Sequence, residues 1–118
     1  MFAGEYLTAS FAEVYSVFDD AVRQVAARSE QVAVRARDKV RHVSAGVASL
    51  PIEWRDPTAP SGWSPGEIRV LQVQSGGSPR TELMVAAPAT VPGAAARQFL
   101  EVLSSATQTL LTLAAPVG

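Results

Sequence analysis

Hydrophobic side chains recur at steps of three and four residues through the first fifty positions of the chain. At about 100° per residue, such positions share one side of a helix. Glycine and proline, which mark turns, are absent from residues 5–45, and their absence also favours a helix. The pattern predicts one long amphipathic helix over residues 5–48, whose stripe runs through Phe11, Val14, Phe18, Val22, Val25, Ser29, Val32, Ala36, Val40, Val43, Val47 and Leu50.

Both ends of this segment carry helix signals. Ser10 and Glu13 have the spacing of a capping box, in which the serine oxygen and the glutamate satisfy free backbone N–H groups. Gly46 suits the left-handed position just after a helix, and Pro51 follows shortly afterwards. These signals predict where the helix begins and ends.

Two alternatives to one long helix stay open. Ser29 is the only polar member of the stripe, so the segment is alternatively two helices broken near Ser29. Residues 31–37, QVAVRAR, also alternate between apolar and basic types, and a strand there would account for Val34, which the helix leaves exposed. We favour the helix because a strand would need turns near Ser29 and Asp38, where neither glycine nor proline is available.

The second half of the chain is richer in turn residues and strand formers. Residues 51–66 form a connector rich in Pro, Gly and Ser, with alternation that allows a short third strand at 52–55. Residues 67–87 predict a β-hairpin with a longer loop, and residues 92–114 predict a C-terminal helix. The order indicates an α+β fold, a single domain over 1–118, with the C-terminal helix packed on a small antiparallel sheet.

Composition narrows the classes of protein without naming one. The 118 residues include no cysteine, which excludes disulfides and thiolate sites. The longest uncharged run, residues 102–118, is interrupted by several Ser, Thr and Gln side chains, so we expect no membrane span. No secretory signal is evident, and we expect a cytoplasmic protein.

The sequence offers no constellation typical of catalysis. His42 is the only histidine, and Asp38, one helical turn away, would be an ordinary surface partner. Gly76 and Gly77 next to Arg80 fit a turn better than a phosphate loop, because no helix follows them. We therefore predict a protein that is not an enzyme and holds no metal and no cofactor. A small-molecule-binding domain would need a pocket between sheet and last helix, which the sequence does not reveal.

The predicted long helix suggests self-association. A helix of about 35 residues would be roughly 50 Å long, whereas a compact domain of this size is only about 35 Å across. An overhanging apolar stripe needs a partner, most simply a second copy. We therefore expect a homo-oligomeric assembly or adaptor protein, and a protein partner as well, with an association surface formed by Phe11, Phe18, Val25, Val32, Arg35, Lys39, Val43 and Trp63.

Charge along the chain is strongly uneven. Residues 1–20 carry a net charge of −4 and residues 21–42 a net charge of +4. Acidic and basic stretches of two antiparallel copies would face each other. The alternative is a dimeric nucleic-acid-binding protein whose phosphate contacts come from Arg23, Arg28, Arg35, Arg37, Lys39 and Arg41.

The predicted order of elements is similar to that of the YbaB/EbfC nucleoid-associated proteins. These also have about this length, with a long N-terminal helix, a small antiparallel sheet and a C-terminal helix, and they dimerise. The resemblance covers most of the chain as an outline, while the Trp-containing connector at residues 51–66 departs from it. It implies a homodimer and favours the DNA-binding alternative.

Overall fold

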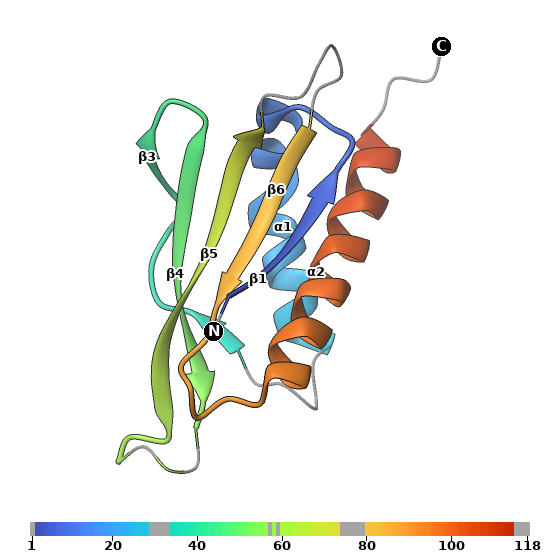
Figure 1. Cartoon of the computed structure of the whole chain (residues 1–118). Coiled ribbons are helices and arrows are strands. Elements are labelled where there is room, and N and C mark those ends of the chain that lie inside the picture. The colour runs from blue at the N-terminus through green and yellow to red at the C-terminus, as the bar shows by residue number, and fades with distance from the viewer. Residues whose placement is uncertain (1, 29–33, 57, 59, 74–79, 115–118) are drawn as a thin grey trace.

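Figure 1 shows the computed structural model of the chain, which describes residues 2–28, 34–56, 58, 60–73 and 80–114. Two helices and six strands follow one another in an α+β order, as predicted. The elements in chain order are β1 (Phe2–Leu7), α1 (Phe11–Arg28), β2 (Val34–Ala36), β3 (Arg41–Ser44), β4 (Val47–Arg55), β5 (Trp63–Val73), β6 (Arg80–Ala86) and α2 (Gly93–Ala114).

The six strands form one antiparallel sheet in the order β1-β6-β5-β4-β2, and β3 also pairs with β4. Both helices lie on the same side of this sheet, with α2 beside β1 and α1 behind the strands in the view of Figure 1. The structure thus has an inner sheet face covered by helices and an outer face without a helix. Among the described residues, neither helix is long and apolar enough to cross a membrane.

Alternation along the strands decides which side chains enter the core. In β4, Ala48, Leu50, Ile52 and Trp54 are buried, while the residues between them are at least partly exposed. The antiparallel register sets Leu50 opposite Ile68 of β5, so the inward positions of neighbouring strands coincide. The resulting cluster of buried side chains fills the space between the sheet and the two helices.

Trp54 is the largest side chain of this core. Its ring meets Phe99 of α2 edge to face, with 5.3 Å between ring centroids, and its indole N–H donates to the Ala86 carbonyl at 3.2 Å. The indole crosses β5 where the chain has Gly66, since a Cβ there would lie 2.3 Å from Trp54 Nε1. The core therefore depends on a glycine at this strand position.

Helix α1 begins as the sequence predicts. Glu13 N–H donates to Ser10 Oγ at 3.2 Å, and Ser10 N–H donates to Glu13 Oε1 at 3.4 Å, which completes the capping box. Val14, Phe18 and Val25 then face the core. The helix ends at Arg28, so the prediction of one helix over residues 5–48 is wrong in its extent. Residues 5–7, which that prediction placed in the helix, belong to β1 instead.

The strand interpretation of residues 31–37 is correct where the structure describes it. Val34 is buried at 8% exposure and pairs with Trp54, as part of β2. Asp38 makes the next bend without glycine or proline, because its Oδ1 accepts the Lys39 N–H at 2.7 Å. Gly46, with φ of 72°, lies in the β3–β4 turn and ends no helix. Val32 and the break considered at Ser29 lie outside the described residues.

The second half agrees better with the prediction. The hairpin expected at residues 67–87 is formed by β5 and β6, which pair from Glu67 with Ala86 to Val73 with Arg80. The helix expected at residues 92–114 is α2. The supposed connector at residues 51–66 is mostly strand, because β4 and β5 run through it and pair from Pro51 with Glu67 to Arg55 with Trp63.

Candidate functional site

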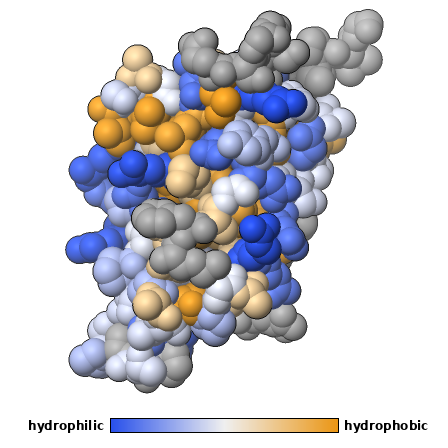
Figure 2. Space-filling model, in the orientation of Figure 1, coloured by the Kyte–Doolittle hydropathy of each residue, from blue (hydrophilic) through white to orange (hydrophobic). Residues whose placement is uncertain are grey.

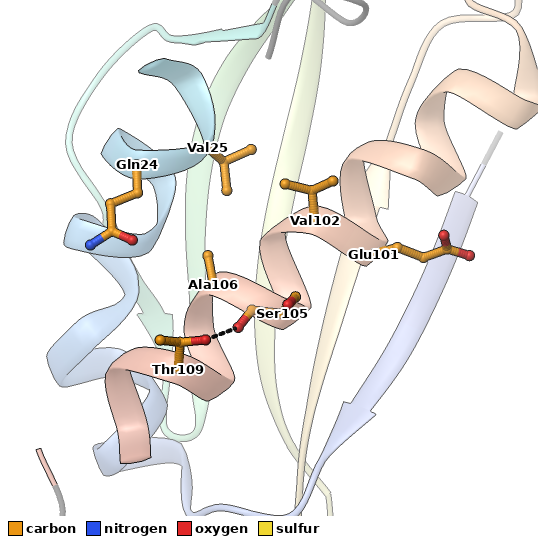
Figure 3. Close-up of a pocket in the computed structure, with 7 residues that line it drawn as sticks. All are labelled: Gln24, Val25, Glu101, Val102, Ser105, Ala106 and Thr109. Atoms are coloured by element: carbon orange, nitrogen blue, oxygen red, sulfur yellow. Dashed lines mark hydrogen bonds between the residues drawn. The ribbon is translucent and has the colours of Figure 1, made fainter. Parts of the chain in front are cut away.

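Helices α1 and α2 leave an open cleft between them, which we call the α1–α2 cleft. Figure 3 shows Gln24 and Val25 on α1 facing a row of α2 side chains. Its volume is about 320 Å³, within the range of small-molecule pockets. The lining residues of the α1–α2 cleft are Gln24, Val25, Glu101, Val102, Ser105, Ala106 and Thr109.

The α1–α2 cleft has an apolar floor and a polar rim. Val25 is buried at 1% exposure, and Val102 is exposed at 41% and so meets solvent in the cleft. The Thr109 hydroxyl donates to the Ser105 carbonyl one turn earlier at 3.0 Å, which fixes the threonine side chain. The Glu101 carboxylate points to the far side of α2 from Gln24 (Figure 3). The cleft therefore presents hydroxyl and amide groups at its rim, without a charge aimed into it from the lining residues.

A second, more polar hollow lies on the other side of α2, against β1. Its volume is about 430 Å³, and Glu101, Ser105 and Thr109 form the ridge shared with the α1–α2 cleft. Glu5 also lines this hollow, so it is acidic. Tyr6 pairs with Glu82 of β6, and a hydrogen bond from the Tyr6 hydroxyl to the Glu82 carboxylate raises the pKa of Tyr6. An anion would meet the carboxylates of Glu5 and Glu101 there.

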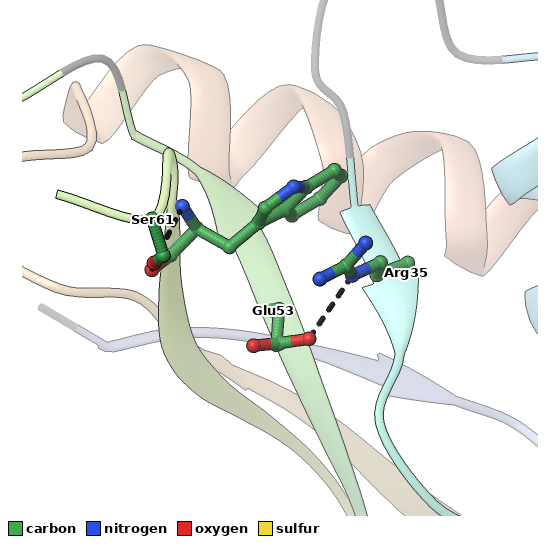
Figure 4. A network of polar contacts seen from close by, with 4 residues as sticks. Arg35, Glu53 and Ser61 are labelled. Carbon is green, nitrogen blue, oxygen red and sulfur yellow. Dashed lines mark hydrogen bonds and ion pairs between the residues drawn. The ribbon is translucent and has the colours of Figure 1, made fainter. Parts of the chain in front are cut away.

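Trp63 and its neighbours form a cluster on the outer sheet face. The Arg35 guanidinium lies 3.9 Å from the centroid of the Trp63 ring, and the Arg55 guanidinium lies 5.8 Å from it. Arg35 Nε donates to Glu53 Oε1 at 3.0 Å, as Figure 4 shows. Ser61 Oγ accepts the Trp63 N–H and donates to the Trp63 carbonyl, which closes the turn before β5. This arrangement holds a half-buried tryptophan beside two cations.

Asp56 is a buried carboxylate that the sequence reading did not single out. It accepts hydrogen bonds from the Thr58 N–H and hydroxyl and from the hydroxyls of Ser64 and Thr90. These donors, those of Thr58 first, hold the pKa of Asp56 far below its usual range. Asp56 links the β4–β5 turn to the segment before α2. Its role is structural, and the Asp-Pro-Thr spacing typical of Asx turns was the available signal.

His42 also has a packing environment and no catalytic partner among the described residues. Its ring lies 4.4 Å from that of Tyr15 and 5.8 Å from that of Phe11, measured between centroids. Asp38, the partner considered for it, instead binds Arg41. The described residues include no group of three or more potential ligands that would suit a metal ion.

The predicted association residues are dispersed by the fold. Phe18 and Val25 are buried inside the chain, and Phe11 packs beside Tyr15. Val43 is exposed at 61% near the β3–β4 turn, where Figure 2 shows hydrophobic surface gathered at the upper left. Val32 lies outside the described residues. Arg35, Lys39 and Trp63 lie on exposed or partly exposed surface, and the first two belong to the basic segment between α1 and β4.

The predicted nucleic-acid residues divide into two groups. Arg23 lies on α1, paired with Asp19 at 2.7 Å, and Arg28 is the last residue of that helix. The other four lie in or between β2 and β3, on the far side of the sheet from α1 or at its edge. These four are Arg35, Arg37, Lys39 and Arg41.

No protein-family model matches the chain, and no curated protein resembles it in sequence. Solved structures do resemble its fold. TTHA0849 from Thermus thermophilus superposes with a TM-score of 0.52 at 17% identity, covering 98% of this chain and 99% of that one. Ms6760 from Mycobacterium smegmatis gives 0.51 at 12% identity, covering 99% and 91%.

A third structure of similar fold is the di-domain ARO/CYC StfQ from the steffimycin biosynthetic pathway. It superposes with a TM-score of 0.51 at 10% identity, covering 94% of this chain and 44% of that chain. Identities this low establish a common fold and leave function to the residues of the site. The comparisons therefore show a fold shared with proteins from Thermus thermophilus and Mycobacterium smegmatis.

Proposed function

We propose that the protein binds a small, mostly apolar and uncharged molecule in the α1–α2 cleft. The observation that supports this is the cleft itself, about 320 Å³ of open space with a floor of Val25 and Ala106. Pockets of this size with apolar walls and a few polar groups are the usual form of small-molecule sites. One neighbour in fold, StfQ, comes from a biosynthetic pathway, which fits a fold that meets small molecules.

The lining residues define the chemistry of the ligand. Val25, Val102 and Ala106 provide apolar contact for its body. The Gln24 amide and the Ser105 hydroxyl provide donors and acceptors for one polar end. No cation is among the described residues that line the cleft, so an anionic ligand would lose its hydration without gaining a partner. A neutral ligand with an aliphatic or aromatic body fits best.

The proposed role is binding without catalysis. The lining residues offer one carboxylate, hydroxyls and an amide, but no imidazole or amine to act as a base beside a hydroxyl nucleophile. The single histidine, His42, packs beside Phe11 at the start of α1, about 21 Å along the helix axis from Val25. The proposal includes a cytoplasmic location, which the absence of cysteine permits.

Self-association also stays a prediction, although the surface first expected to mediate it is not available. The long helix that suggested it is replaced by the end of β1, α1, strands β2 and β3 and the start of β4, and the apolar stripe of α1 is covered within the chain. A dimer would therefore use another surface. Light scattering of the purified chain at tens of micromolar tests this prediction, and a monomer would contradict it.

The binding proposal is tested with N-phenyl-1-naphthylamine, a neutral fluorophore whose emission rises in apolar sites. A cleft of this size holds a ligand of about 15 non-hydrogen atoms, worth roughly 5 kcal/mol at typical efficiency, which corresponds to a Kd of order 0.1–1 mM. Val102→Arg places bulk and charge in the α1–α2 cleft from a partly exposed position. We expect it to weaken fluorophore binding at least tenfold.

Ala94→Arg is the matched control, because Ala94 is exposed in the first turn of the same helix and does not line the cleft. It should bind the fluorophore as the parent does. No rise in emission at 0.1–1 mM protein, or equal binding by both variants, would refute the proposal.

A further inference from the structure

Strands β2 and β3 are two halves of one interrupted edge strand. Arg35 pairs with Glu53 of β4, and Arg41 pairs with Ser49. Between them, the Arg37 N–H donates to the Pro51 carbonyl at 2.8 Å, which continues the register of β2. Arg37 and Arg41 are four residues apart, whereas their partners on β4, Pro51 and Ser49, are only two residues apart. The two extra residues form a bulge at the sheet edge.

This register places three arginines in one row. Glu53, Pro51 and Ser49 of β4 all alternate with buried residues and so point to the outer sheet face. The arginines opposite them, at positions 35, 37 and 41, therefore point to the outer face as well. All three are exposed. Strand alternation, and not a helical flank, is what brings these cations together.

More cations extend the row, and we call the whole surface the basic face. Lys39 lies in the bulge, and Arg55 and Arg69 project from the outer positions of β4 and β5. Figure 2 shows hydrophilic surface along the left edge of the sheet, below the hydrophobic patch. The basic face consists of Arg35, Arg37, Lys39, Arg41, Arg55 and Arg69, together with the acids Asp38, Glu53 and Glu67 and the aromatic Trp63.

The basic face has a surplus of positive charge that the chain leaves unpaired. Its six cations and three acids give +3, while all other residues of the chain together carry −4. Arg35, Arg41 and Arg69 each pair with one of the acids. In the described part of the chain no carboxylate pairs with Arg37, Lys39 or Arg55. Three exposed cations are thus available to an anionic partner.

Trp63 adds a second kind of contact to the basic face. Its ring lies beside the guanidiniums of Arg35 and Arg55, which are planar groups that stack on nucleobases as indole does. Along the sequence the basic segment has no aromatic residue interleaved with it, because Trp63 is 28 positions from Arg35. Pairing of β2 and β5 with the same strand, β4, brings them into contact.

We propose that the basic face binds single-stranded nucleic acid. The positive charge attracts the phosphates. Trp63 and the guanidiniums of Arg35 and Arg55 provide a surface on which nucleobases can stack, and an acidic protein has no bases to place there. Alternate strand positions are about 6.8 Å apart, so the arginine row runs as an extended track for a backbone. Among the described residues, no helix projects from this face to enter the major groove of a duplex.

The expected binding is weak and salt-dependent. With about four phosphates neutralised, log K falls with log salt at a slope of roughly −2.8 for a single strand, which is about a 50-fold loss between 50 and 200 mM salt. Fluorescence anisotropy of a labelled 20-nucleotide oligothymidylate, titrated with the full chain at both salt concentrations, measures this slope. Absence of binding at 50 mM salt and 100 µM protein would overturn the proposal, as would binding insensitive to salt.

Variants locate the site. Arg37→Glu combined with Lys39→Glu reverses two unpaired charges at an exposed bulge, and should weaken binding at least tenfold. The matched pair is Arg37→Glu alone and Arg97→Glu, each of which reverses one charge. Arg97 is exposed on α2, on the opposite layer, and its reversal should change affinity less than threefold. Equal losses in both variants would show attraction by net charge alone and overturn the assigned site. Thermal melts confirm that both fold.

A competition experiment separates nucleic acid from an acidic protein. Polyglutamate of about 20 residues offers similar charge without bases to stack. We expect it to displace the oligonucleotide only at concentrations at least tenfold above those of unlabelled oligothymidylate. Equal competition would overturn the proposal in favour of an acidic polypeptide. Trp63→Leu should weaken oligothymidylate binding and leave polyglutamate binding unchanged.

Discussion

Replacing Gly66 with alanine is expected to damage the core through a single atom. A Cβ at this position would lie 2.3 Å from Trp54 Nε1 and 2.7 Å from the Ala86 carbonyl oxygen. Ordinary contacts begin near 3.4 Å, so the indole must withdraw by about 1 Å, although it is only 1% exposed. Withdrawal stretches the 3.2 Å bond from the indole N–H to Ala86 until it no longer forms.

The magnitude follows from two costs and one gain. A buried donor left without its acceptor costs about 1–3 kcal/mol, and overpacking of a dense core costs about 1–3 kcal/mol. The lower chain entropy of unfolded alanine returns about 0.4–1 kcal/mol. We expect Gly66→Ala to lower the free energy of unfolding by about 2–4 kcal/mol, a fall in Tm of roughly 8–16 °C for a chain of this length.

Urea denaturation followed by tryptophan fluorescence and circular dichroism measures the loss. Gly4→Ala is the matched control, because its Cβ would meet Glu82 Oε2 at 3.4 Å, an ordinary contact with a flexible side chain; we expect a change within about 0.5 kcal/mol. In a Trp54→Phe background, which removes the indole N–H, Gly66→Ala should cost at least about 1 kcal/mol less than in the parent, while the 2.7 Å approach to the Ala86 carbonyl oxygen keeps part of the cost. A similar cost in both backgrounds would refute the role of Trp54.

Two further predictions concern Asp56, for which the sequence predicted no role, and β2, which the sequence offered only as the alternative to a helix. Asp56→Asn should destabilise the fold, since an amide N–H₂ cannot accept hydrogen bonds from the hydroxyls of Ser64 and Thr90 as the carboxylate oxygen does. Because the pKa of Asp56 is lowered in the folded state, the stabilisation by its carboxylate is present above about pH 4 and is lost as the pH falls below that. The urea midpoints of parent and variant should therefore converge toward about pH 2. Val34→Ala should lower the free energy of unfolding by about 1.5–3 kcal/mol, because Val34 is a buried residue of β2. Ala36→Ser, at an exposed position, should lower it by less than about 0.5 kcal/mol. The helix prediction requires the opposite ranking of the two variants, and urea denaturation measures which ranking holds.

The sequence allowed a correct prediction wherever local signals agreed with one another. The capping box at Ser10 and the absence of early turn residues predicted the start of α1. The hairpin of β5 and β6 and the helix α2 were also predicted, because glycine and proline bound them clearly. These elements depend on neighbours close in the chain, which a sequence displays directly.

Residues 34–55 were predicted poorly because their structure depends on distant pairing. A run rich in Val and Ala supports a helical stripe and a strand alternation at the same time. What selects the strand is the pairing of Val34 with Trp54 and of Arg41 with Ser49 along β4, and the bend at Asp38 is made by a side chain and not by glycine. None of these contacts is local enough to appear as a sequence period.

The candidate sites were missed for a related reason. The α1–α2 cleft joins Val25 to Ala106, and the outer cluster joins Arg35 to Trp63. The two residues of each pair are far apart in the chain, so no motif of fixed spacing indicates either site. The residues of the basic segment were identified from the sequence, but their arrangement was not, since it follows from the register of β4.

The uneven charge of the chain now has an explanation within one molecule. The acidic stretch lies largely on α1, where Glu13, Asp19 and Asp20 are exposed, whereas the basic stretch continues to the outer sheet face. The fold therefore places the acids of α1 and the bases of β2 and β3 on opposite layers, while Arg23 and Arg28 stay on α1. The antiparallel pairing of two copies is not needed to account for the uneven charge. A partner that reads only net charge would see −1. A partner that covers only the basic face would meet a charge of +3, and this difference is why charge reversal at Arg37 should matter far more than the same reversal at Arg97.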